Sequence, residues 1–134
     1  MNQTAKDSRR VLASGWAVVG TATWVATLFA IVAIAISSRT ISRPPWWLGP
    51  STDPATPFAL IILAIVITFT AVTFLGSYSV APWIGVFSSG FLGVYAIVDL
   101  GATIGVAVAQ IVVAVAALAG SLATFAGLHR VTPQ

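Results

Sequence analysis

The sequence has no cysteine and no glutamate, and it contains only one lysine and one histidine. A chain without cysteine has no disulfides, no thiolate metal sites and no catalytic thiols. Charged residues make up only 7% of the 134 positions, whereas a soluble domain carries about a quarter. Hydrophobic residues make up 58% of the chain, and a water-soluble fold of this length cannot bury so much apolar surface. The composition therefore predicts a membrane protein.

Charge is missing altogether from three long runs of the sequence. These runs separate Arg10 from Arg39, Asp53 from Asp99, and Asp99 from Arg130. A helix rises about 1.5 Å per residue and the hydrocarbon core is about 30 Å thick, so one crossing needs about 20 residues. The three runs therefore fit one, two and one crossings.

The middle run contains a break between Gly76, which suits a helix end, and Pro82, which suits a first helical turn. The sequence thus predicts an all-α fold, a polytopic membrane protein with four transmembrane helices in an up-down bundle with short loops. The expected helices are about 11–38, 57–76, 80–98 and 101–127, in a single transmembrane domain that covers 1–134. The first is expected to be a retained helix, because its apolar run is far longer than the roughly 7–15 residues of a signal peptide.

The positive charges predict the orientation of the chain. Three of the six Lys and Arg residues precede the first segment and Arg130 follows the last, whereas Arg39 and Arg43 lie in the loop 39–56. By the positive-inside rule we expect both termini in the cytoplasm and the loop 39–56 outside. The abundance of Ala, Val, Gly and Thr with almost no Lys is typical of a GC-rich bacterial genome, so the expected location is a bacterial plasma membrane.

The loop 39–56 combines prolines with two adjacent aromatic residues, Trp46 and Trp47. Proline forbids a regular helix, and tryptophan favours the headgroup layer because it joins an apolar ring to one N–H donor. Arg39 and Arg43 are placed to reach lipid phosphates. The loop is therefore expected to anchor the chain to membrane lipids. A docking patch for a partner is the alternative, because Trp and Arg are enriched in binding hot spots.

Small residues recur at four-residue spacing, which is typical of helix packing in lipid. The third and fourth segments are joined by a very short turn, so we expect antiparallel neighbours whose small-residue stripes face one another. Packing against another chain is the alternative. The stripes consist of Gly85, Ser89 and Gly93 in the third segment, and of Gly101, Gly105, Ala109, Ala119, Ala123 and Gly127 in the fourth.

Two polar side chains accompany the fourth segment. Asp99 precedes it and is expected to be its N-cap, accepting the free N–H groups of the first turn. The alternative is an ion-coupling carboxylate, because acids within membranes often handle ions or protons. Gln110 lies about two turns inside the segment, where an unpaired amide is costly, so it is expected to bond to a neighbouring helix or to a partner subunit.

The residue inventory argues against catalysis, because the spans contain no nucleophile with a base, no carboxylate pair and no metal-ligand cluster. No cofactor or metal is expected, and the scattered cations predict no nucleic-acid partner. We expect a non-catalytic accessory or assembly subunit of a larger bacterial membrane complex, which contacts lipids and other membrane subunits or itself. One alternative is a small homo-oligomeric channel or transporter with Asp99 or Gln110 in its path. Another is a membrane sensor or regulator that uses the Trp loop.

Overall fold

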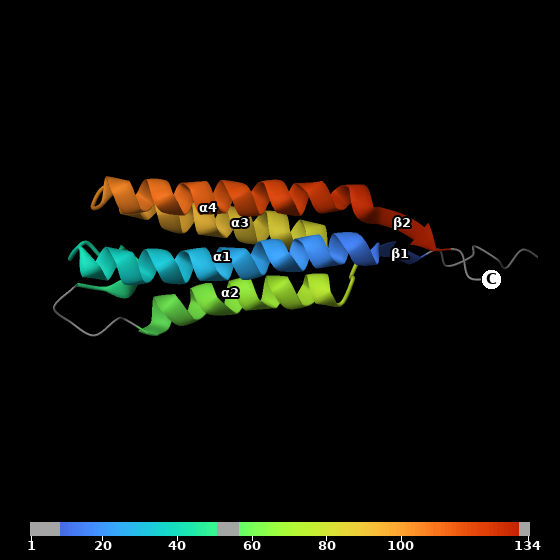
Figure 1. The fold of residues 1–134 in the computed structure, drawn as a ribbon, viewed down its shortest axis with the longest axis horizontal. Coiled ribbons are helices and arrows are strands. Elements are labelled where there is room, and N and C mark those ends of the chain that lie inside the picture. Colours follow the sequence, from blue (N-terminus) through green and yellow to red (C-terminus); the bar gives the residue numbers. More distant parts are fainter. Residues whose placement is uncertain (1–8, 51–56, 132–134) are drawn as a thin grey trace, which may run out of the picture.

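The computed structural model describes residues 9–50 and 57–131, in which four long α-helices form one bundle (Figure 1). The helices are α1 Ser14–Thr40, α2 Pro57–Leu75, α3 Ala81–Asp99 and α4 Ile104–Ala123. α1 and α3 each contact both α2 and α4, so the helices follow one another around the bundle in chain order. All four are long and apolar enough to cross a membrane. The predicted all-α, up-down bundle of four transmembrane helices is confirmed.

The helices begin and end close to the predicted breaks. α2 ends at Leu75 and α3 begins at Ala81, with Pro82 in its first turn, so the chain reverses where the sequence predicted. The last helix is shorter than expected, because α-helical bonding stops at Ala123 and a 3₁₀-helix, η2 Thr124–Gly127, completes the segment. A further short 3₁₀-helix, η1 Trp46–Leu48, lies in the loop after α1.

A strand pair that was not expected from the sequence joins the two ends of the described chain. β1 Arg9–Leu12 and β2 Leu128–Val131 pair antiparallel, with Arg10 opposite Arg130 and Leu12 opposite Leu128. Both strands lie at one end of the bundle, which we call the terminal end (Figure 1). The opposite end carries η1 and the turn 100–103, and we call it the loop end.

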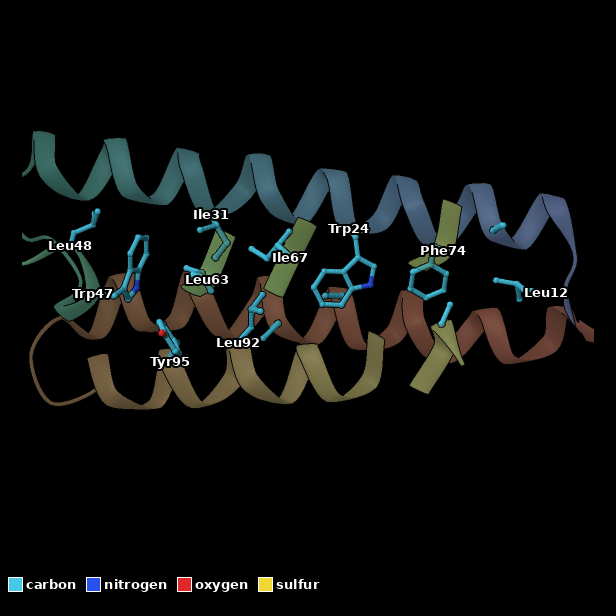
Figure 2. Close-up of a cluster of buried hydrophobic side chains, with 14 residues drawn as sticks. Leu12, Trp24, Ile31, Trp47, Leu48, Leu63, Ile67, Phe74, Leu92 and Tyr95 are labelled. Atoms are coloured by element: carbon cyan, nitrogen blue, oxygen red, sulfur yellow. The ribbon is translucent and has the colours of Figure 1, made fainter. Parts of the chain in front are cut away.

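The core is a row of large side chains along the bundle axis (Figure 2). Trp24 of α1 is fully buried and donates its indole N–H to the Ser121 hydroxyl of α4 over 3.2 Å. Glycine makes room for the bulky residues, because a Cβ atom added at Gly20 would overlap the Phe74 ring. The largest fully buried apolar side chains of this row are Trp24, Trp47, Leu63, Ile67 and Phe74.

Candidate functional site at the loop end

A buried carboxylate organises the loop end of the bundle. Asp99 is the last residue of α3 and is 0% exposed. Its Oδ1 accepts a hydrogen bond from the backbone N–H of Trp46 over 2.9 Å, and its Oδ2 accepts one from Gln110 Nε2 over 2.7 Å. One side chain therefore ties the loop after α1 to both α3 and α4.

The prediction that Asp99 caps α4 is wrong. The N-cap of α4 is Thr103, and no side chain bonds to the first turn there. The backbone carbonyl of Asp99, not its carboxylate, accepts the N–H groups of Ala102 and Thr103 over 3.1 and 2.8 Å. The carboxylate belongs to the last turn of α3 and is directed at Trp46 and Gln110, so it does not bond to the start of the next helix.

Gln110 bonds to a neighbouring helix, as predicted, because its amide donates to Asp99 of α3. The amide nitrogen of Gln110 donates and the carboxyl oxygen of Asp99 accepts, so each group takes a role that its chemistry allows. The two polar side chains of the α3–α4 pair thus satisfy each other.

The two tryptophans of the loop have different environments. Trp46 is about half exposed, packs its ring 5.0 Å from that of Tyr95, and donates its indole N–H to the Tyr95 carbonyl over 3.3 Å. Trp47 is 0% exposed and points into the core (Figure 2). The prediction that the tryptophan pair lies in the headgroup layer as a lipid anchor is therefore wrong for Trp47, since the tight η1 turn directs consecutive side chains to opposite sides. In this structure only Trp46 of the pair is at the surface.

The two arginines of the loop also differ. Arg39 is partly buried, and its Nη2 donates to the Leu48 carbonyl over 2.9 Å, so it holds the loop to the end of α1. Arg43 is exposed. Its backbone N–H donates to the Ser38 carbonyl over 2.9 Å, which fixes the residue beside the last turns of α1. Of the two predicted lipid contacts, Arg43 is the one with an exposed side chain.

The small-residue stripe of α3 lies partly in the helix interface. Gly85 and Ser89 are buried, and a Cβ atom added at Gly85 would overlap the Ser121 side chain of α4. Gly93 is only partly buried, and a Cβ atom added there would meet nothing within 4 Å. The predicted contact between α3 and α4 is present, and Gly85 lies directly against Ser121 of α4 within it.

The predicted stripe of α4 mostly faces away from α3, so this part of the prediction is wrong. Gly101, Gly105, Ala119 and Ala123 are exposed, Ala109 is partly buried, and Gly127 is buried against Trp16 rather than α3. Small residues occupy most faces of α4, so spacing alone does not select the buried one. The polar residues determine which face of α4 is buried, because Gln110 and Ser121 find hydrogen-bond partners, Asp99 and Trp24, only on the buried face. The buried face of α4 consists of Val106, Ala107, Gln110, Ala114, Ala117 and Ser121.

Separate hollows lie between the outer sides of α1 and α4, and together we call them the α1–α4 groove. Its loop half is a hollow of about 530 Å³ that reaches from Ala33 to Arg43 on one side and from Thr103 to Ala109 on the other. An adjoining hollow of about 510 Å³ shares Arg43 and Thr103 with it. The terminal half, a hollow of about 360 Å³, is lined by small and β-branched residues: Thr23, Ala26, Thr27, Ala30, Val113, Ala116 and Ala117.

The described residues contain no group of three His, Cys, Asp or Glu side chains that could hold a metal ion. The two features with assignable chemistry are thus the buried Asp99–Gln110–Trp46 cluster and the α1–α4 groove beside it. Known proteins add no assignment to either of them. No family model, no curated protein and no solved structure matches the chain.

Proposed function

We propose that this chain is a non-catalytic accessory subunit of a larger membrane protein complex, and that it joins the complex through the terminal half of the α1–α4 groove. One observation carries the proposal. α4 exposes the small residue Ala116 in this half of the groove and the small residues Ala119 and Ala123 on the turns that follow it, and no helix within the described part of the chain covers them. Helices in lipid associate by close packing between small residues, so this stripe is suited to receive a partner helix.

The outer face of α2 supports this choice of surface by contrast. It exposes Phe58, Ile61, Ile65 and Phe69, whose long side chains keep another backbone at a distance and suit contact with lipid acyl chains. On the α1 side of the groove, Ala26 and Ala30 are small as well. A partner helix therefore approaches the α1–α4 face more closely than the α2 face.

The proposed location is a bacterial plasma membrane with both termini in the cytoplasm. Arg9, Arg10 and Arg130 lie on the strands of the terminal end, whereas Arg39 and Arg43 lie at the loop end. The excess of cations at the terminal end supports a cytoplasmic position for it under the positive-inside rule.

A channel or transporter would use Asp99 or Gln110 as a group that lines the path. The two side chains bond to each other and are buried, which supports a structural role for both. A sensor built on the Trp loop would have Trp46 but not Trp47 at its surface. We therefore retain the accessory subunit as the proposed function.

The absence of cysteine allows a direct test by site-specific cross-linking. Ala119→Cys introduces a single thiol on the proposed partner face, and Phe69→Cys introduces one on the outer face of α2. We expect the first variant to cross-link to a larger membrane protein in native membranes, and the second to give no such product.

Purification of the unmodified chain in mild detergent provides the second measurement. The proposal predicts elution with a larger protein at fixed stoichiometry, and a double variant with Ala116→Leu and Ala119→Leu should separate from it. Gly90→Leu is the matched control, because Gly90 is exposed on α3 with nothing within 4 Å of an added Cβ. Elution as a lone monomer or as a symmetric oligomer of this chain would contradict the proposal.

A further inference from the structure

We infer that the loop half of the α1–α4 groove binds one anionic phospholipid, with the phosphate at the start of α4 and an acyl chain along the groove. This inference goes beyond the proposed function, and the isolated chain suffices to test it. Three features carry it: an apolar hollow, an exposed cation at its mouth, and an uncapped helix N-terminus with a buried hydroxyl group that has no partner among the described residues.

The hollow has the size and lining that suit a hydrocarbon chain. Its volume of about 530 Å³ lies within the range of about 300–1,000 Å³ that is common for small-molecule sites. Gly105 contributes no side chain, and a Cβ atom added there would meet nothing within 4 Å. The apolar part of the wall is formed by Ala33, Ile34, Ile41, Ile104, Val106 and Ala109.

The polar groups gather at one end of this hollow. Arg43 is exposed and lines both adjoining hollows, so its guanidinium group is available where they meet. Arg39 is less suited to this role, because its Nη2 is bonded to the Leu48 carbonyl. No acidic side chain among the described residues lines either hollow, since the Asp99 carboxylate is bonded to Trp46 and Gln110. As far as the described residues go, the charge at the mouth of the site is therefore positive.

The start of α4 adds hydrogen-bond donors at the same place. Thr103 is the N-cap, yet its side chain makes no capping bond, and the first turn contains no acidic residue. Thr103 is only 9% exposed and lines both hollows, and its Oγ1 is buried without a hydrogen-bond partner within the described part of the chain. A helix N-terminus with free N–H groups and its positive dipole end favours an anion such as phosphate.

The occupant that satisfies both parts is an anionic phospholipid. A free phosphate ion would use the donors but leave the apolar wall of the groove empty. A zwitterionic choline lipid would bring its cationic group beside Arg43, where no carboxylate of the described residues is available to receive it. A lipid at this position also agrees with the proposed partner contact. Small-residue interfaces often cross at about −40°, so a helix packed on the terminal half diverges from the loop half.

The test is a lipid titration of the purified, delipidated chain by native mass spectrometry. We expect one bound phosphatidylglycerol per chain, with at least tenfold weaker binding of phosphatidylcholine and no binding of inorganic phosphate. Arg43→Gln should weaken phosphatidylglycerol binding about fivefold, because one cation near the headgroup is lost. Arg43→Lys should retain most of the affinity, since the charge remains.

Substitutions in the groove test the position of the acyl chain. Gly105→Leu should abolish the bound lipid by filling the hollow. Gly90→Leu and Arg10→Gln are matched controls on other surfaces, and they should bind like the unmodified chain. A loss of helix in Gly105→Leu, seen by circular dichroism, would leave Arg43→Gln and Thr103→Val as the deciding variants. Equal retention of both lipids, equal effects of the controls, or tight binding of inorganic phosphate would each overturn the inference.

Discussion

The two ends of the bundle are closed by different kinds of chemistry. At the loop end, the side chains of Asp99 and Gln110 and the backbone of Trp46 form a buried polar cluster. At the terminal end, the backbones of β1 and β2 pair with each other, and β1 also bonds to the turn after α2, where Leu12 N–H donates to the Ser77 carbonyl over 3.2 Å. Closure by side chains depends on the identity of a few residues, whereas closure by backbone tolerates many substitutions.

The difference follows from the cost of burying polar groups. A buried carboxylate is stable only while its hydrogen-bond partners are present, so loss of one member leaves the others buried and unpaired. A backbone ladder keeps its bonds when an exposed side chain is replaced. The loop end should therefore be sensitive to single polar substitutions, and the terminal end should be sensitive mainly to changes that block the approach of its segments.

The largest effect is expected from Asp99→Ala at the loop end. The change leaves the Trp46 N–H and the Gln110 amide without their acceptor, and it should lower the free energy of unfolding by about 3 kcal/mol. Unfolding in mixed detergent micelles measures this loss. Arg10→Ala, an exposed change on β1, is the control at the terminal end and should stay within about 0.5 kcal/mol. Similar losses for both variants would remove the proposed contrast.

Gly127→Val should have the next largest effect, and it acts at the terminal end. A Cβ atom at position 127 would overlap the Trp16 indole, so the added bulk forces α1 and η2 apart at a cost of about 2 kcal/mol. The matched change at the loop end is Gly101→Ala, where an added Cβ meets nothing within 4 Å. Thermal unfolding in detergent should lower the midpoint for Gly127→Val and leave it nearly unchanged for Gly101→Ala.

Gln110→Met should cost about 1 kcal/mol, because it removes one hydrogen bond within the membrane and keeps the side-chain volume. A double-mutant cycle with Asp99→Asn isolates the interaction between the two side chains. We expect the combined loss to be smaller than the sum of the single losses. Strict additivity would show that the 2.7 Å contact contributes nothing to the stability of the loop end.

Trp46→Phe should have the smallest effect, about 0.5 kcal/mol, which is the lower end for one hydrogen bond. It keeps an aromatic ring beside Tyr95 and loses the indole N–H bond to the Tyr95 carbonyl, which is long at 3.3 Å and lies at a half-exposed residue. Trp47→Phe is the variant to compare with Trp46→Phe, because it removes no hydrogen bond: Trp47 is fully buried, and its Nε1 has no hydrogen-bond partner among the described residues. A larger loss for Trp46→Phe than for Gln110→Met would reverse the expected order within the polar cluster.

Part of the candidate site was predictable from residue type alone. A glutamine inside a membrane span needs a partner, and Gln110 has one on α3. The identity of that partner was not predictable, because Asp99 also stood one turn before α4 and matched the pattern of a helix cap. The pairing of β1 with β2 had no sequence signal, since its segments lie at opposite ends of the chain and are only four residues long.

The number of crossings, their breaks and the adjacency of α3 and α4 follow from the sequence, because helix length and the cost of unpaired backbone in lipid depend on local composition. Three other features depend on contacts between distant segments. They are the buried face of α4, the choice of Trp46 or Trp47 as the core residue, and the hydrogen-bond partners of the Asp99 carboxylate. The hydrophobic effect contributes little to helix association in lipid, so close packing and a few polar bonds determine which of several almost equally apolar faces is buried. These contacts form only in the assembled bundle, so the tertiary structure decides them.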